Sequence, residues 1–109
     1  MRHELVSALV RYFLARAGYG GSVRVFTRRE TFDRAARGRN GPPSEQDDMA
    51  ATIHGRVPLV WVDPKEHATI AQLADTAAHE AAHIVLGPGF PHGRAFDRRV
   101  RRLTRGGSL

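Results

Sequence analysis

Two imidazoles and one carboxylate lie within five residues of this sequence, in the pentapeptide His-Glu-Ala-Ala-His at residues 79–83. If the segment is helical, His79 and His83 lie on the same face, one turn apart. Their ring nitrogens could then bind one zinc ion, each at about 2.0–2.1 Å. Glu80 lies roughly 100° round the helix, where it can reach a water on the metal without occupying a metal position. The spacing therefore predicts two ligands and a general base on one short segment.

The flanking sequence favours a helix around this pentapeptide. Residues 66–86 include no Gly or Pro and are rich in Ala, the best helix former. Asp63 and Pro64 form a start signal, because Asp suits the N-cap and Pro the first helical position. Gly87 and Pro88 form a stop signal. The expected apolar stripe of this helix consists of Ile70, Leu73, Ala74, Ala77, Ala81 and Ile84. The two histidines point away from that stripe and therefore need another partner.

A catalytic zinc site needs a third protein ligand and an open position. His92 is the first candidate, since eight residues separate it from His83 and their Gly and Pro residues permit a turn. A second helix is expected to open at residues 92–96. Asp97 is the alternative ligand, because carboxylates also bind catalytic zinc. The longer pattern H-E-x-x-H-x-x-G-x-x-H is excluded, because it requires His at the position of Gly89.

The pentapeptide, the Gly-containing turn and the His-Gly-x-x-Phe stretch at residues 92–96 together resemble the catalytic core of the SprT-like metallopeptidases. They are also similar to the related WLM group of DNA–protein crosslink proteases. The resemblance covers about residues 57–103, and its sharp part is residues 79–96. The sequence departs from the SprT pattern in having no Cys, so the zinc ribbon common after that core has no ligands here.

This resemblance assigns roles to individual residues. It implies that His79, His83 and His92 bind zinc and that Glu80 is the catalytic acid and base. It also implies that Phe96 packs behind the site and seats the second helix. The implied fold is zincin-like, with a small sheet packed against the catalytic helix.

A three-histidine site leaves one metal position for a water, whose pKa zinc lowers towards neutrality. Glu80 would take the proton of that water as it attacks a peptide carbonyl, and would pass the proton to the leaving amine. The developing oxyanion needs a further donor. His54, His67, Tyr19 and the arginines are all candidates for that donor.

Length and composition indicate one small domain. The chain has 109 residues, of which 41% are hydrophobic, enough for one modest core. We expect a single α+β domain at residues 1–109, with helices before and after the sheet and the catalytic helix. No apolar run approaches the ~18 residues of a membrane span, and residues 1–4 do not open a signal peptide. Because there is no Cys, disulfides and thiolate ligands are excluded. We expect a cytoplasmic monomer that does not bind membranes.

The net charge of +6 is concentrated in residues 92–105, where six arginines stand against one acidic residue. Phe96, Val100 and Leu103 would form the apolar stripe of a helix there, so most of the arginines would face water. The candidate contacts to nucleic-acid phosphates are Arg94, Arg98, Arg101, Arg102 and Arg105. The alternative is a solvated basic face without a partner.

Apolar periodicity predicts the remaining elements. They are helices at 3–17 and 27–36, strands at 22–26, 51–54 and 57–62, and a polar, mobile loop at 38–48. In zinc peptidases an extended substrate commonly pairs with a strand edge beside the metal helix. We therefore expect one edge of residues 59–62 to be free, since Pro58 indicates a strand that starts near an edge. The alternative is an ordinary core strand. Trp61 is expected in the core.

The sequence thus favours a zinc-dependent metallopeptidase, with proteins held on DNA as candidate substrates. One alternative is a nucleic-acid-binding accessory protein with a non-catalytic metal site. Another is a zincin-type toxin or antirestriction effector that uses the same core. Closed structural zinc sites fill all four positions with protein ligands, and only Asp97 could complete such a set nearby.

Overall fold

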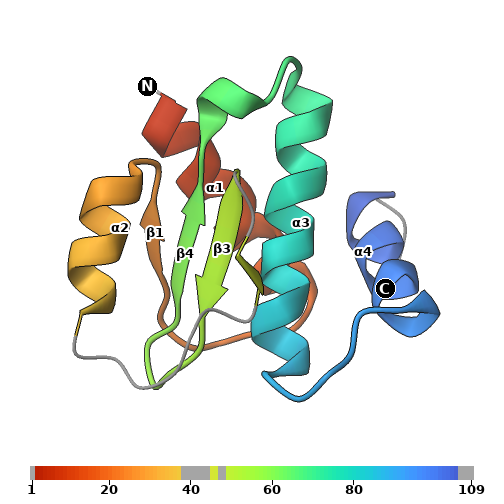
Figure 1. Cartoon of the computed structure of the whole chain (residues 1–109). Helices are drawn as coiled ribbons and strands as arrows, with labels where there is room; N and C mark the ends of the chain where they lie inside the picture. The colour runs from red at the N-terminus through yellow and green to blue at the C-terminus, as the bar shows by residue number, and fades with distance from the viewer. Residues whose placement is uncertain (1, 38–44, 47–48, 106–109) are drawn as a thin grey trace.

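The computed structural model describes residues 2–37, 45–46 and 49–105 of the chain (Figure 1). It has the α+β fold that the sequence predicts. The helices are α1 (Arg2–Arg16), α2 (Arg29–Ala36), α3 (Ile70–Leu86) and α4 (Arg94–Thr104), with a 3₁₀ turn η1 (Pro64–Glu66) before α3. The strands are β1 (Arg24–Phe26), β2 (Glu45–Gln46), β3 (Ala50–Ile53) and β4 (Leu59–Val62). In this part of the chain, no helix has the length and apolar composition that a membrane crossing requires.

The strands form one mixed sheet in the order β1-β4-β3-β2. β4 pairs in parallel with β1, with Arg24 opposite Leu59, and antiparallel with β3, with Ala51 opposite Trp61. Both edges of β4 are therefore occupied, and the prediction that residues 59–62 offer a free edge is wrong. The prediction relied on Pro58, which precedes the strand and does not lie within it. Its carbonyl accepts a hydrogen bond of 3.0 Å from the backbone N–H of Arg24. A Pro at the entry to a strand is compatible with an interior position.

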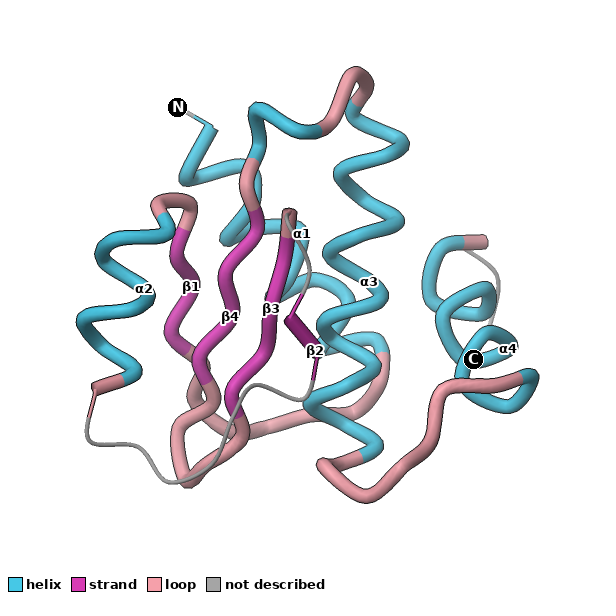
Figure 2. Tube along the Cα trace, viewed as in Figure 1, coloured by secondary structure: helices cyan, strands magenta, loops and turns pink. Residues whose placement is uncertain are grey.

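The two faces of the sheet build two cores, because successive side chains of a strand point to opposite faces. Helix α2 covers one face, where Phe32 packs with Leu59 and Trp61. Helices α1 and α3 cover the other, where Val60 and Val62 join the larger core (Figure 2). Trp61 is buried as expected. Helix α4 lies against α3 at the side of the molecule furthest from α2 (Figure 1).

The start of α3 differs from the sequence prediction. Asp63 and Pro64 begin the 3₁₀ turn η1 instead, and the Asp63 side chain accepts a hydrogen bond of 2.9 Å from the backbone N–H of Lys65. Thr69 is the N-cap of α3, and its hydroxyl accepts from the backbone N–H of Gln72 at 3.1 Å. Two capping signals follow each other along the chain, and the second one starts the long helix.

The predicted apolar stripe of α3 is buried at its centre and open at its first residue. Leu73, Ala77, Ala81 and Ile84 are buried, whereas Ile70 is 65% exposed. Because α3 begins at Ile70, this side chain lies in the first turn, away from the helix–helix contact. The predicted end is confirmed: α3 stops at Leu86, and Gly87 has a φ of 88°, a conformation that glycine adopts without strain.

The other predicted elements are present, and their ends differ from the prediction by no more than two residues. The exception lies in the predicted loop at 38–48, where Glu45 and Gln46 form β2. A two-residue strand is too short to show the alternation by which strands are predicted. The prediction of a mobile loop for residues 38–44 and 47–48 lies outside the described residues.

Candidate metal centre

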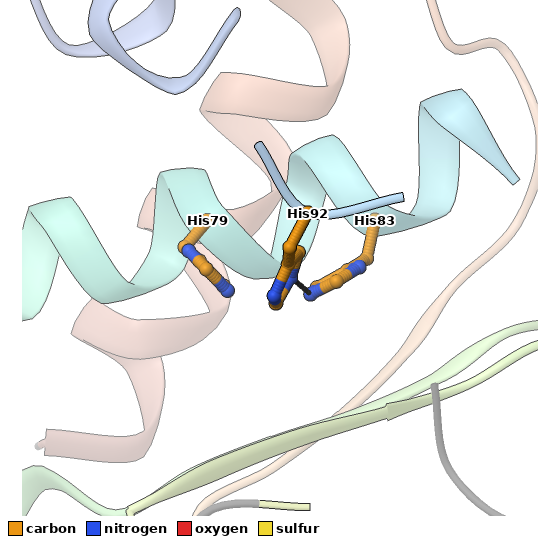
Figure 3. A group of neighbouring side chains, drawn as sticks. All are labelled: His79, His83 and His92. Atoms are coloured by element: carbon orange, nitrogen blue, oxygen red, sulfur yellow. Dashed lines mark hydrogen bonds between the residues drawn. The ribbon is translucent and has the colours of Figure 1, made fainter. Parts of the chain in front are cut away.

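Three histidines from two segments gather beside α3. His79 and His83 lie one turn apart on that helix, and His92 lies in the loop that leads into α4. Figure 3 shows the three rings turned towards a common point. One nitrogen from each ring lies within 4.8 Å of the other two, and the Nε2 atoms of His83 and His92 are 3.0 Å apart. The structure therefore brings together the three residues that the sequence predicts as ligands.

The arrangement fits a tetrahedral metal ion. Nitrogens bound to zinc at about 2.0–2.1 Å lie roughly 3.3 Å from each other, close to the separation between His83 and His92. His83 is buried, His79 is half-buried and His92 is exposed. One side of the cluster is therefore covered by protein, and the other is open to solvent. Asp97, the alternative third ligand, does not belong to the cluster and is exposed on α4. Among the described residues, the set that could share an ion here is three histidines, which leaves a fourth metal position for solvent or substrate.

Phe96 packs against all three histidine rings of the cluster. This side chain is 1% exposed, and its ring centroid lies 4.9, 4.6 and 4.6 Å from those of His79, His83 and His92. Because Phe96 sits in the first turn of α4, packing it against α3 also restricts where His92, four residues earlier, can reach. Phe96 thus packs where the family resemblance implies.

Glu80 is anchored to the sheet. It is 2% exposed, and the hydroxyl of Thr52 on β3 donates a hydrogen bond of 2.7 Å to its Oε1. A carboxylate taken out of water is costly unless hydrogen bonds replace its hydration. Thr52 is itself fully buried, so this bond is shielded from solvent. The sequence offers no signal for this pairing, because Thr is an ordinary strand residue and its partner lies 28 positions away.

Two pockets border the cluster, one on each side. The first, here called the acidic pocket, has a volume of about 280 Å³ and is lined by Met49, Ala50, Asp75, Thr76, His79, Glu80 and Val100. The second, here called the neutral pocket, has a volume of about 290 Å³ and is lined by His83, Gly87, Pro88, Phe90, Pro91 and His92. Glu80 therefore reaches the wall of a pocket although its side chain is nearly inaccessible. A molecule long enough to occupy both pockets would pass over the three histidines.

The candidate oxyanion donors from the sequence lie elsewhere. The Tyr19 hydroxyl donates to the Ser22 carbonyl at 2.8 Å and so stabilises the turn after α1. The buried His67 ring bonds the Asp63 carbonyl and the Thr76 hydroxyl, each at 2.7 Å, and so ties η1 to α3. Burial lowers the pKa of the His54 imidazole, which favours its neutral form. None of these three residues lines either pocket, and neither pocket is lined by an arginine.

Comparison of the chain with protein-family models, with curated proteins and with solved structures found no match. The resemblance to the SprT-like metallopeptidases therefore rests on residues 79–96 and their spacing.

We predict one zinc ion per chain, bound at His79, His83 and His92. His92→Ala should weaken zinc binding by more than the roughly 10–100-fold that changes around the ligands cost. Asp97→Ala should have little effect, because Asp97 lies outside the cluster. Binding should also weaken below about pH 6, because ligating imidazoles must be neutral. Metal content by mass spectrometry and competition with a chelating dye measure both effects. Loss of binding in Asp97→Ala but not in His92→Ala would show that the third ligand is wrongly assigned.

We also predict that Thr52 stabilises the fold through Glu80. Thr52→Val keeps the shape of the side chain but removes the donor, and should lower the free energy of unfolding by about 1–3 kcal/mol. Thr52→Ser keeps the hydroxyl and is the matched control. Urea denaturation of each variant, repeated in a Glu80→Leu background, measures the coupling. A loss for Thr52→Ser without a loss for Thr52→Val would mean that packing of the methyl group, rather than the hydrogen bond, carries the effect.

Proposed function

We propose that this protein is a zinc-dependent metallopeptidase. The observation that carries the proposal is the pairing of a three-histidine cluster, open on one side, with a buried carboxylate that is not part of the cluster. Hydrolysis of a peptide bond requires both parts: a site for the metal and a separate group that moves protons. The family resemblance on residues 79–96 supports the same chemistry.

Each residue of the site has a distinct role in this proposal. His79, His83 and His92, in their neutral forms, hold the ion. A zinc ion held there supplies Lewis acidity towards a carbonyl oxygen and lowers the pKa of a water towards neutrality. Glu80 accepts the proton of the attacking water and delivers it to the leaving amine. Thr52 restrains the Glu80 side chain, so that the carboxylate meets its substrate already oriented.

The geometry favours this function over a non-catalytic metal site. A structural zinc site is closed by a fourth protein ligand. Within the described part of the chain, no fourth His, Cys, Asp or Glu joins the cluster, and the exposed His92 borders an open pocket. A toxin or antirestriction effector of the zincin type would use the same site and differ only in its target protein.

A second function, DNA binding, is favoured by the surface of α4. Its buried residues are Phe96 and Leu103, with Val100 half-buried, and the arginines of residues 94–105 are exposed. The salt bridges recorded among the described residues join Arg28 to Glu30 and Arg29 to Asp33, so none involves these arginines. A basic face next to the metal centre, with no salt bridge among the described residues, is suited to phosphate groups, and we propose that it holds DNA close to the site.

Glu80→Gln tests the catalytic proposal. The variant should keep its zinc, because Glu80 is not a ligand, and should keep the Thr52 contact, because the Gln carbonyl also accepts a hydrogen bond. Cleavage of casein or histone should fall by at least ~10²-fold. Zinc content and unfolding free energy, measured on the same preparation, are the controls. Undiminished cleavage would remove Glu80 from the mechanism, and joint loss of zinc and structure would assign it a structural role.

DNA binding by α4 should be strongly salt-dependent and show little sequence preference, because phosphate contacts release counterions. Removing four charges should reduce the slope of log affinity against log salt by roughly 0.9 per lost contact. The test variant changes Arg98, Arg101, Arg102 and Arg105 to Gln. The control removes four exposed charges elsewhere by changing Arg2, Arg34, Arg37 and Arg56.

The measurement is fluorescence anisotropy with duplex and single-stranded oligonucleotides between about 50 and 200 mM salt. The α4 variant should also cleave DNA-bound protein more slowly, while its cleavage of short peptides stays unchanged. No binding at the lowest salt would reject DNA binding and leave the peptidase proposal standing. Equal loss in the test and control variants would mean that net charge, rather than the α4 face, attracts DNA.

A further inference from the structure

The acidic and neutral pockets on either side of the metal centre differ in charge, because carboxylates line only the acidic pocket. Both are of similar size, about 280 and 290 Å³, and each includes part of the histidine cluster. Apart from histidine, the neutral pocket is lined by Gly, Pro and Phe. The acidic pocket has two carboxylates, Glu80 and Asp75. Since Glu80 is nearly inaccessible and bonded to Thr52, Asp75 is the carboxylate that an incoming side chain would meet.

Asp75 is placed for contact with a substrate. It lies one helical turn before His79, so the two side chains share a face of α3 about 5–6 Å apart between Cβ atoms. Asp75 is exposed, and within the described part of the chain no hydrogen bond or salt bridge is recorded for it. The neighbouring Thr76 hydroxyl is already bonded to His67. A carboxylate without a structural partner therefore stands at the mouth of a pocket that opens onto the metal centre.

The remaining walls of the acidic pocket suit the stem of a long basic side chain. The apolar residues Met49 and Ala50, at the start of β3, and Val100, on α4, come from two segments on different sides of the space. Lys and Arg bury their aliphatic stems against apolar surface while the charged head reaches a partner. Asp75 provides that partner in a chain whose net charge is +6, where an acidic group on the surface is the minority charge.

We propose that the acidic pocket receives a Lys or Arg side chain of the substrate and that Asp75 is its counter-ion. This inference rests on the proposed peptidase function and assigns its substrate class: basic polypeptides, cut close to a basic residue. The neutral pocket receives an uncharged side chain from the other side of the scissile bond. In an extended peptide, residues advance about 3.3 Å each, so side chains within a few positions of the cut can reach both pockets.

The test compares three peptides that differ only at one position, which is Lys, norleucine or Glu. With the zinc-loaded full chain, kcat/KM should be about two- to fivefold higher for Lys than for norleucine, the ratio expected of an exposed ion pair. Scanning the Lys along the peptide identifies the position that enters the pocket. Asp75→Asn should reduce the ratio to about one, and Asp75→Lys should make Glu the preferred residue. Asp97→Asn, which removes an exposed acid outside both pockets, should leave the ratio unchanged.

The same peptides, fluorescently labelled, are then bound to zinc-loaded Glu80→Gln protein with and without Asp75→Asn, and affinity is measured by anisotropy. This second assay separates the two proposals. Absence of cleavage together with a preference for Lys that Asp75→Asn abolishes would reject the peptidase and support the pocket. Cleavage with a Lys-to-norleucine ratio that Asp75→Asn does not alter would support the peptidase and overturn the pocket. Equal affinity for all three peptides, or no binding of any, would also overturn it.

Discussion

The hydrogen bond between Thr52 and Glu80 is the contact on which the site depends. It joins the helix that carries two of the three histidines to the sheet behind it, and both partners are buried. Thr52 lies opposite Val60 in the β3–β4 pairing, so the register of the sheet decides which side chain faces Glu80. A slip of one residue would turn Thr52 to the α2 side of the sheet and bring an apolar neighbour to the carboxylate. The hydrogen bond that orients the Glu80 carboxylate on α3 therefore depends on the pairing of β3 with β4.

The second constraint is the packing of α4, because the chain that leads into it carries His92, the histidine of the cluster that does not lie on α3. Gly87 ends α3 with a positive φ, and the chain returns so that Phe96 contacts all three histidine rings. Phe96 and Leu103 are buried, so α4 is held by apolar packing even without an ion. The three ring nitrogens are therefore brought close together by the fold itself, which reduces the conformational entropy that a metal ion must overcome on binding.

The sequence predicted what depends on short-range spacing. A four-residue interval on an Ala-rich segment is enough to place His79 and His83 together, and the Gly and Pro residues before His92 are enough to predict a turn. Two predictions failed because they depend on distant partners or on competing local signals. Whether β4 has a free edge is decided by β1, which pairs with it from more than thirty residues away. The start of α3 depended on a choice between two adjacent caps, at Asp63 and Thr69, that are both chemically sound.

The residues that sequence reasoning missed, Thr52 and Asp75, share a physical reason. Each gains its role from a neighbour in space, Thr52 from the buried carboxylate and Asp75 from the pocket that Met49 and Val100 help to line. The charges around the site also indicate which chemical groups each surface would bind. In the two proposals, the arginines of α4 bind phosphate and Asp75 binds a basic side chain, and screening over about 8–10 Å would let these opposite preferences coexist on a small domain. A basic protein held on DNA presents both partners at once, and for such a substrate the two proposed surfaces would reinforce each other by raising the local concentration of the bond to be cut.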